Sequence, residues 1–300
     1  MYARDDIRSS LAPAPARTND PNAPVKPAQT IEFRTLPPTE RGARGGSTWI
    51  ARAANLVISY SDALAGEVFD RDDQPDEYTL VLFSESAPLR ITAGDDTVEV
   101  AEEALVVVPP GPSRVEVLAD GPVIRLFSTR AADLVDAALN ADAYREPDLH
   151  AAPLEPWPDP VGGFALRVYP LAATPIVPGT FGRILRTTTV MVNFLAEEPA
   201  PRDPHALSPH FHDDFEQISL AVKGRFRHHI RYPWVPDLAQ WRDDEHLDVG
   251  SPSICIIPPP TIHTTQGLGP HQQLIDVFAP PREDFSAAGW VRNADEYPAR

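Results

Sequence analysis

Short runs of alternating apolar and polar residues recur along the 300-residue chain, as in TIEFRTL at 30–36, YTLVLF at 78–83 and SICIIP at 253–258. Runs of this length, separated by turn residues roughly every eight to twelve positions, are typical of strands in a sandwich or barrel. The strongest helical pattern is RAADLVDAALNADAY, so we predict one short helix near 131–143. The pattern therefore predicts an all-β protein.

Two proline-rich stretches divide this pattern. Residues 1–30 contain almost no large apolar side chain, so we expect an irregular or disordered arm that carries no chemistry. The stretch PDLHAAPLEPWPDP follows the predicted helix and favours a boundary near residue 150. Beyond it, RTTTVMVNF at 186–194 repeats RAANLVISY at 52–60, apolar position for apolar position. We therefore predict two tandem β-domains, over 31–150 and 151–300.

Composition narrows the classes of partner and compartment. A net charge of −17 argues against nucleic acid or an anionic membrane as the main partner, since either needs a basic face. The single cysteine, Cys255, excludes an intramolecular disulfide, and its apolar neighbours predict a buried small hydrophobic residue. No run is long enough to span a membrane, and the first residues lack the apolar core of a signal peptide. We therefore expect a cytoplasmic protein.

Three histidines stand beside strand-like runs in the second half. His210 and His212 are separated by a single residue and precede the alternating run at 217–223, and His263 follows the run at 253–258. Alternate side chains of a strand leave the same face, so the first two imidazoles can point at one spot. Three imidazoles and one oxygen donor can hold Fe, Mn, Ni, Co, Cu or Zn and leave positions for water or substrate. We therefore predict that these three residues bind a metal ion.

These residues resemble the two motifs of the cupin superfamily. The first motif places His-x-His before an acidic residue and a later glycine, which here is Gly224. The second motif is Pro-x-Gly-x-x-His, which Pro258 and His263 match, although Pro260 replaces the glycine. The resemblance covers roughly residues 45–128 and 180–280. It implies a bicupin with two tandem double-stranded β-helix, or jelly-roll, barrels.

The resemblance leaves two candidates for the fourth metal ligand. Counting forward from His212 and back from Gly224 leads to Gln217, which we place first. Glu216 takes this role if a small bulge shifts the register, and otherwise it can act as a general base near the metal. If Gln217 faces the barrel interior, strand alternation places Ser219 there as well.

The first half aligns with the same motifs but lacks their ligands. A constant offset between the halves places Asp70, Asp72 and Glu77 at the first motif, so that Glu77 corresponds to Gln217. At the second motif, after an insertion in the second half, Arg114 stands at the position of the last histidine. Because arginine stays protonated, it cannot ligate a metal and more readily pairs with the carboxylates. We therefore expect a degenerate barrel with a structural role.

The run RFRHHI at 225–230 carries further candidates. Alternation places either Arg225 and Arg227 or Phe226 and His228 inside the barrel, and it does not decide between them. An inward arginine or histidine suits a carboxylate or enolate substrate. Our candidate catalytic residues are therefore Arg227, His228 and Glu216.

An aromatic insertion separates the two motifs of the second half. It contains Trp234 and Trp241 and is absent from the first half. Such an insertion either closes the barrel mouth as a lid or packs the two barrels together.

The resemblance implies a metal-dependent enzyme that acts on a small polar substrate with a carboxylate or an enolisable carbonyl. Neutral ligands leave the ion its full charge to bind an anionic substrate, which slightly favours dioxygenase-like chemistry. Iron is our first choice of divalent metal, before Mn, Ni, Cu or Zn. Ligation by Glu216 favours isomerase or lyase chemistry instead. The alternative from another class is a non-catalytic, metabolite-binding bicupin, and a homodimer stays open for either.

Overall fold

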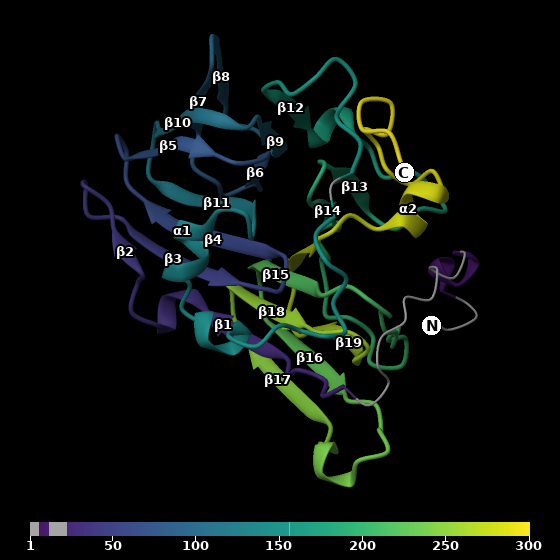
Figure 1. The fold of residues 1–300 in the computed structure, drawn as a ribbon. Coiled ribbons are helices and arrows are strands. Elements are labelled where there is room, and N and C mark those ends of the chain that lie inside the picture. Colours follow the sequence, from purple (N-terminus) through teal and green to yellow (C-terminus); the bar gives the residue numbers. More distant parts are fainter. Residues whose placement is uncertain (1–5, 12–22, 156) are drawn as a thin grey trace.

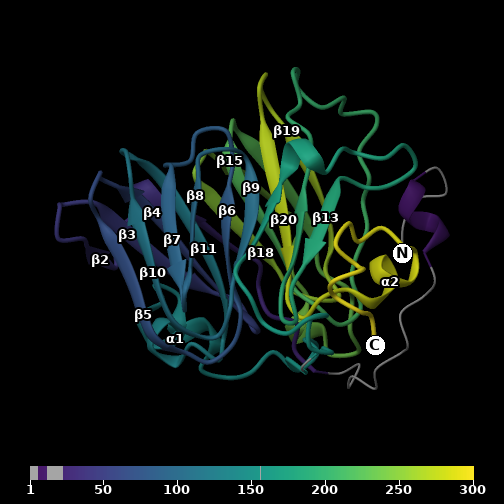
Figure 2. The same ribbon diagram turned by 90° about the horizontal axis from the view of Figure 1, so that it is seen from above.

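Strands from the two halves of the sequence form two barrels that lie side by side (Figure 1 and Figure 2). The computed structural model describes residues 6–11, 23–155 and 157–300. Its named strands pair antiparallel, and the fold class is all-β, as predicted. No helix among the described residues is long and apolar enough to cross a membrane.

The first barrel consists of a seven-stranded and a four-stranded sheet. In spatial order, the larger sheet contains β12 (Arg167–Pro170), β9 (Ala104–Val108), β6 (Tyr78–Leu82), β11 (Gly121–Ser128), β4 (Leu56–Ala63), β3 (Ser47–Arg52) and β2 (Glu40–Arg41). The smaller sheet contains β5 (Val68–Gln74), β10 (Gly111–Val117), β7 (Leu89–Ala93) and β8 (Asp96–Val100).

The second barrel consists of a six-stranded and a three-stranded sheet. The larger sheet contains β1 (Gln29–Glu32), β18 (Ser253–Ile257), β15 (Gln217–Lys223), β20 (Gln273–Phe278), β14 (Met191–Phe194) and β13 (Arg183–Arg186). The smaller sheet contains β17 (Glu245–Val249), β16 (Phe226–Arg231) and β19 (Ile262–Gly267).

Each half of the chain gives one edge strand to the barrel of the other half. β1 pairs antiparallel with β18 of the second barrel, and β12 pairs antiparallel with β9 of the first (Figure 1). The sheets therefore do not divide at residue 150, where the sequence places the boundary. An edge strand has free N–H and C=O groups that accept a partner from elsewhere in the chain, and sequence patterning does not identify that partner.

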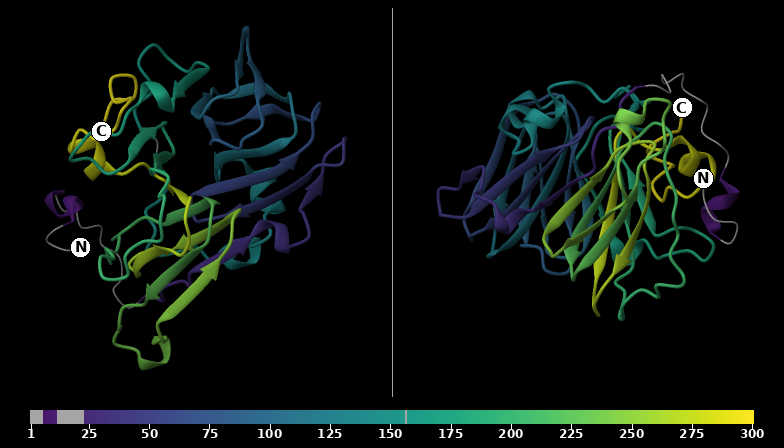
Figure 3. Two further views of the ribbon diagram at one scale, coloured as in Figure 1. Left: turned by 180° about the vertical axis from the view of Figure 1, so that it is seen from behind. Right: turned by 90° about the horizontal axis from the view of Figure 1, so that it is seen from below.

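The two larger sheets face each other across a shared hydrophobic core. β4 and β6 contribute Ile58 and Val81 from one side, and β15 and β18 contribute Leu220 and Ile256 from the other, each at most 1% exposed. This is the face-to-face sheet packing of a sandwich, built between two barrels. Views from behind and from below show the same two adjacent halves (Figure 3).

The interiors of the two barrels differ. Side chains that alternate with those of the shared core, such as Tyr78 and Leu80, point into the first barrel and fill it with apolar groups. The corresponding positions of the second barrel are Gln217 and Ser219, which line a cavity of about 550 Å³. Room for a ligand therefore exists in the second barrel, where the sequence places the metal motifs.

The helices are short and lie outside the sheets. The helix predicted near 131–143 is divided into α1 (Ala132–Ala137) and the 3₁₀-helix η3 (Ala141–Tyr144), and α2 (Glu283–Ala287) lies near the C-terminus. The remaining 3₁₀-helices are η1 (Ile7–Ser10), η2 (Phe33–Thr35), η4 (Leu171–Ala173) and η5 (Leu238–Gln240). The predicted irregular arm lies in part outside the described residues, and its described part includes η1 and the start of β1.

The aromatic insertion joins β16 to β17 at the tip of a hairpin that projects away from the barrels (Figure 1). Trp234 and Trp241 stack on each other, with ring centroids 4.5 Å apart and planes 5° from parallel. Trp234 is 77% exposed. Neither tryptophan lines the cavity or belongs to the shared core, whereas Tyr232 of the same insertion is buried and accepts a hydrogen bond from the Ala28 N–H at 2.8 Å.

Candidate metal centre

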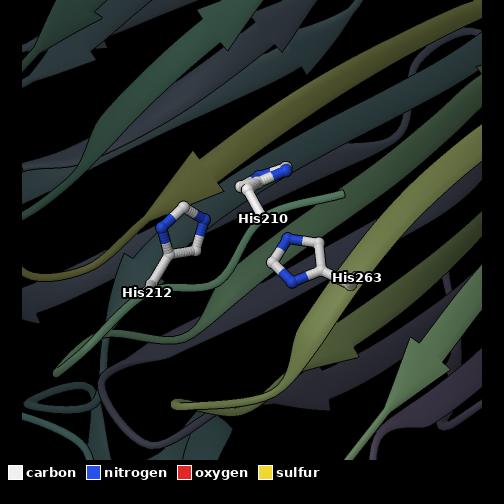
Figure 4. A group of neighbouring side chains, drawn as sticks. All are labelled: His210, His212 and His263. Carbon is white, nitrogen blue, oxygen red and sulfur yellow. The ribbon is translucent and has the colours of Figure 1, made fainter. Parts of the chain in front are cut away.

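The backbone places His210 directly opposite His263. The His210 N–H donates to the carbonyl of His263 at 3.0 Å, and the His263 N–H donates back to the carbonyl of His210 at 2.7 Å. A reciprocal pair of this kind fixes two residues opposite each other and sends both side chains to one face. His212 lies beside them, and the three rings surround a common space (Figure 4).

The three imidazoles are close enough to share one ion. One ring nitrogen of each lies within 4.8 Å of those of the other two. The residues are 6%, 4% and 2% exposed for His210, His212 and His263. Burial lowers the pKa of all three, to about 4 for His263, and the arginines nearby lower it further. The rings are therefore neutral near pH 7, which metal ligation requires.

Backbone carbonyls fix the orientation of two of these rings. His210 Nδ1 lies 2.9 Å from the carbonyl of Ser208, and His263 Nδ1 lies 3.0 Å from the carbonyl of Thr261. Because a carbonyl only accepts hydrogen bonds, each Nδ1 carries the proton and each Nε2 offers a lone pair. This arrangement is the usual second-sphere support of a metal-binding histidine.

Gln217 provides the oxygen donor next to the triad. Its Oε1 lies 2.8 Å from His212 Nε2 and 3.3 Å from His263 Nε2. Its Nε2 donates to Ser219 Oγ and to Asp276 Oδ1, both at 3.1 Å. Because these acceptors engage the amide nitrogen, the amide oxygen faces the histidines. The residues present, three nitrogens and one oxygen, therefore fit a divalent metal ion.

Asp276 is a member of this group that the sequence analysis missed. It lies on β20 opposite Ser219, whose hydroxyl donates to its carboxylate at 2.9 Å. Burial raises the pKa of Asp276 to about 6, although Ser219 and nearby arginines oppose that rise. The available signal was a single acid within the otherwise apolar run LIDVF. A charged residue at such a position is costly unless it has partners.

The cavity opens beside the triad and includes an arginine from the N-terminal arm. Its lining contains His210, His263, Gln217 and Asp276, together with Arg8. Arg8 is 4% exposed, and its Nη1 lies 3.3 Å from His210 Nε2. Residues 1–30 were expected to carry no chemistry, but η1 places the Arg8 guanidinium beside the candidate site.

Known structures share the arrangement of strands described above. No protein-family model matches the chain, and no curated protein matches its sequence. Among solved structures, the chain is similar to the formate complex of Lactobacillus farciminis oxalate decarboxylase, with 13% identity, a TM-score of 0.55 and coverage of 84% of this chain and 86% of that one. A structure concerned with the Mn(II) centres of Bacillus subtilis oxalate decarboxylase gives 13% identity, a TM-score of 0.53 and coverage of 86% and 78%.

The fold is that of a bicupin. Oxalate decarboxylases are bicupin proteins, and at 13% identity the likeness concerns the fold alone.

Glu216 of this bicupin lies outside the candidate centre. It precedes β15 and turns toward the first barrel, where its carboxylate accepts hydrogen bonds from the Ala54 N–H and from Tyr144 Oη, the latter at 2.8 Å. The structure therefore does not bring it to the triad, either as a ligand or as a base. The physical reason is alternation: neighbouring residues face opposite sides of the sheet, and Gln217 takes the inner side.

Glu77 of the first half makes an equivalent buried contact with residues of the second half. Its carboxylate accepts from Thr188 Oγ1 at 2.9 Å and from Tyr297 Oη at 2.8 Å, both in the second half. Glu77 directly precedes β6, as Glu216 directly precedes β15. The structural equivalent of Glu77 is thus Glu216 and not Gln217. The constant offset drawn from the sequence fails at this point. The segment between His210 and the start of β15 is one residue shorter than the segment between Asp70 and the start of β6.

The two candidates on β16 face opposite sides. Arg227 points out of the barrel, is 42% exposed and pairs with Asp248 on β17. The structure therefore does not bring Arg227 to the triad. His228 points inward, is 1% exposed, and has its Nδ1 2.9 Å from Thr265 Oγ1. The alternation that the sequence left undecided thus places Phe226 and His228 inside.

The sequence aligned Asp70 and Arg114 with His210 and His263, but in the structure they form an ion pair on the outer face of the first barrel. Arg114 Nη1 lies 3.0 Å from Asp70 Oδ1, and the two side chains are 56% and 52% exposed. They stand opposite each other across β10 and β5, whereas the neighbouring Ser113 is buried and has its Oγ 3.0 Å from Tyr78 Oη. Tyr78, at the position of Gln217, stacks on Phe127 with ring centroids 4.8 Å apart. Apolar packing replaces the ligand pocket there.

Proposed function

We propose that this bicupin is a metal-dependent enzyme that acts on a small carboxylate substrate, with lyase-type chemistry such as decarboxylation. The observation that carries the proposal is the group of three buried neutral imidazoles and one oriented amide oxygen, open to a cavity that also contains an arginine. The oxalate decarboxylases of the same fold support a reaction of this class.

His210, His212, His263 and Gln217 would hold the metal ion. When bound, a divalent ion acts as a Lewis acid that polarises a carboxylate or carbonyl oxygen of the substrate. All four side chains are uncharged at neutral pH, so the full charge of the ion remains for an anionic ligand. Asp276 and Ser219 hold the amide of Gln217 in place, and Leu195 is among the apolar residues that line the cavity.

Iron was our first choice from the sequence, and manganese is the metal named for one neighbour of the same fold. Both ions accept imidazole and oxygen ligands. A dioxygenase reaction is the second candidate. Because Gln217 is neutral, it does not reduce the positive charge of the ion, which can then bind a chelating anionic substrate. A small-molecule substrate and a homodimer are further parts of this proposal.

Metal analysis of the purified protein tests the proposal. We expect about one equivalent of Mn or Fe per chain after reconstitution, and its loss in His263→Ala. His271→Ala is a matched control, because its side chain is 75% exposed and pairs with Glu197 away from the cavity. The loaded protein is then screened with small carboxylates for release of carbon dioxide and for uptake of oxygen.

The outcomes separate the candidate functions. Release of carbon dioxide without net oxygen uptake supports the lyase reaction, whereas stoichiometric oxygen uptake supports the dioxygenase. Metal binding without turnover of any carboxylate favours the metabolite-binding alternative. Absence of metal in the wild-type protein after reconstitution with either ion contradicts the proposal.

A further inference from the structure

We propose that Arg8 and Arg202 form an anion subsite in the cavity of the second barrel and bind a carboxylate group of the ligand. The inference deepens the proposed function, on which it rests, because it names the residues that select a negatively charged substrate. It also gives the N-terminal segment around η1 a role in ligand recognition.

Arg8 is held at the cavity in a defined orientation. Asp6 accepts from Arg8 Nε at 2.9 Å and from Nη2 at 2.6 Å, and it also accepts from the Arg8 backbone N–H. The guanidinium lies over the ring of Phe181, 4.4 Å from its centroid. These contacts engage one edge of the guanidinium and direct Nη1 toward His210 Nε2, 3.3 Å away. The planar fork of arginine is suited to a carboxylate in this position.

Arg202 reaches the same place from the loop between β14 and β15. Its Nη2 donates to Ser208 Oγ at 2.9 Å, and its Nη1 donates to the carbonyl of Thr265 at 2.9 Å. Arg8 Nη2 also donates to Ser208 Oγ, at 3.3 Å. The two guanidiniums therefore converge on one hydroxyl. Burial lowers the pKa of Arg202, and the nearby positive charge of Arg8 lowers it further.

The balance of charge at this end of the cavity favours an anion. The chain carries a net charge of −17, yet two guanidiniums meet here, and among the described residues Asp6 pairs with Arg8. Glu198 and Asp203 also line the cavity, but both are exposed at its rim, where water screens their charge. The buried acid of the cavity, Asp276, already accepts two hydrogen bonds. Asp6 is nearly as buried as Arg8, with side chains 9% and 5% exposed, and offsets its charge, so Arg202 supplies the excess positive charge beside Ser208.

The contact with His210 couples this subsite to the metal site. Arg8 Nη1 donates to the Nε2 lone pair that metal ligation requires, so the guanidinium has to withdraw when a metal ion binds. A carboxylate held at the metal site offers the displaced guanidinium a new, charged acceptor. The ligand class that satisfies both groups is a small mono- or dicarboxylate, whereas the corresponding amide satisfies the arginines poorly.

Calorimetric titration of the manganese-loaded full-length protein tests the subsite, with oxalate and acetate as anionic probes and acetamide as the neutral one. Arg8→Gln removes the charge, Arg8→Lys keeps it without the fork, and Arg202→Gln removes the second cation. We expect affinity for oxalate to fall by about 10- to 100-fold in Arg8→Gln, less in Arg8→Lys, and acetamide binding not to change. The matched control is Arg145→Gln, because Arg145 is 76% exposed and pairs with Asp142.

Metal content measured on each protein keeps this inference separate from the proposed function. Equal oxalate affinity in wild type and Arg8→Gln at full metal content contradicts the subsite and leaves the metal-dependent function standing. Loss of metal in Arg8→Gln also contradicts it, since Arg8 would then support the triad. If the wild type binds no metal, the proposed function fails, and the same comparison of oxalate binding in metal-free proteins decides whether the subsite exists.

Discussion

At the scale of single residues, one position decides which side chain joins the candidate centre. Glu216 and Gln217 are neighbours, and both were candidates for the fourth ligand. The three histidines could be predicted because alternate side chains of a strand share a face and because His263 follows a second strand. The choice between Glu216 and Gln217 could not, because a shift of the register by a single position moves a side chain from the barrel interior to the opposite face.

The buried carboxyl of Glu216 predicts a pH-dependent stability. Burial raises its pKa from 4.5 to about 7, against the hydrogen bonds from Ala54 and Tyr144 that lower it. The folded protein therefore holds this proton more tightly than the unfolded chain does. The resulting stabilisation is complete below about pH 4.5 and is lost as the pH rises through about 7, over a range of up to about 3 kcal/mol.

Glu216→Gln removes this titration. We expect the variant to gain stability relative to wild type, as a larger free energy of unfolding, as the pH rises from about 5 to about 8. Urea denaturation across this range measures the difference. Glu146→Gln, at an exposed position, serves as the control. A difference between Glu216→Gln and wild type that does not vary with pH would show that this carboxyl has a normal pKa.

Arg8 shows a different limit of prediction at this scale. Its neighbours in sequence are mostly polar, and no periodicity marks it as buried. Its position depends on tertiary contacts with Phe181, Ser208 and His210, all of which belong to the second half of the chain. Hydrophobic patterning indicates local structure only, so it cannot predict a contact between residues that lie this far apart in the sequence.

At the scale of elements, most strands followed from alternation, but their partners did not. β6 and β18 lie where the runs YTLVLF and SICIIP predicted strands. The exchange of β1 and β12 between barrels was not predicted, because an amphipathic strand specifies a buried face and leaves its neighbour open. The role of the aromatic insertion stays open in the sequence for a related reason, since aromatic residues indicate a contact without specifying its partner.

The segment that carries β1 predicts a strong effect of one substitution. Phe33 directly follows β1, is fully buried in the shared core and stacks on Tyr60, with ring centroids 5.0 Å apart and planes 6° from parallel. We expect Phe33→Ala to lower the free energy of unfolding by about 3–5 kcal/mol, through lost burial and the cavity left behind. Phe164→Ala is the control, because Phe164 is 43% exposed, and its effect should stay within about 0.5 kcal/mol. Similar losses in both variants would mean that the segment around β1 does not anchor the second barrel.

At the scale of the whole molecule, the two barrels behave as one unit in this structure. They share one hydrophobic core, two exchanged edge strands and the buried contacts of Glu77 and Glu216. The bicupin fold could be predicted because the motifs and the repeat recur in both halves. The interdependence of the halves could not, because it depends on which faces meet.

This interdependence predicts cooperative unfolding. We expect tryptophan fluorescence and far-ultraviolet circular dichroism to report a single, coincident urea transition, although chains with two domains often show two. We also expect residues 31–150 and 151–300, produced separately, not to fold, since each piece lacks an edge strand and exposes one side of the core. Two separated transitions, or a well-folded isolated half, would contradict this expectation.

The exchange of β1 and β12 also bears on how such a protein can be inherited. A genetic event that deletes the first half removes the strand that completes the sheet beside the histidines, and it uncovers the apolar face of that sheet. A gene fragment that encodes the second half alone is therefore not expected to yield a folded, functional protein, even though it encodes all four candidate ligands. Selection on the chemistry of one barrel retains the other, and the barrel without ligands is then free to change its surface but not its inner sheet.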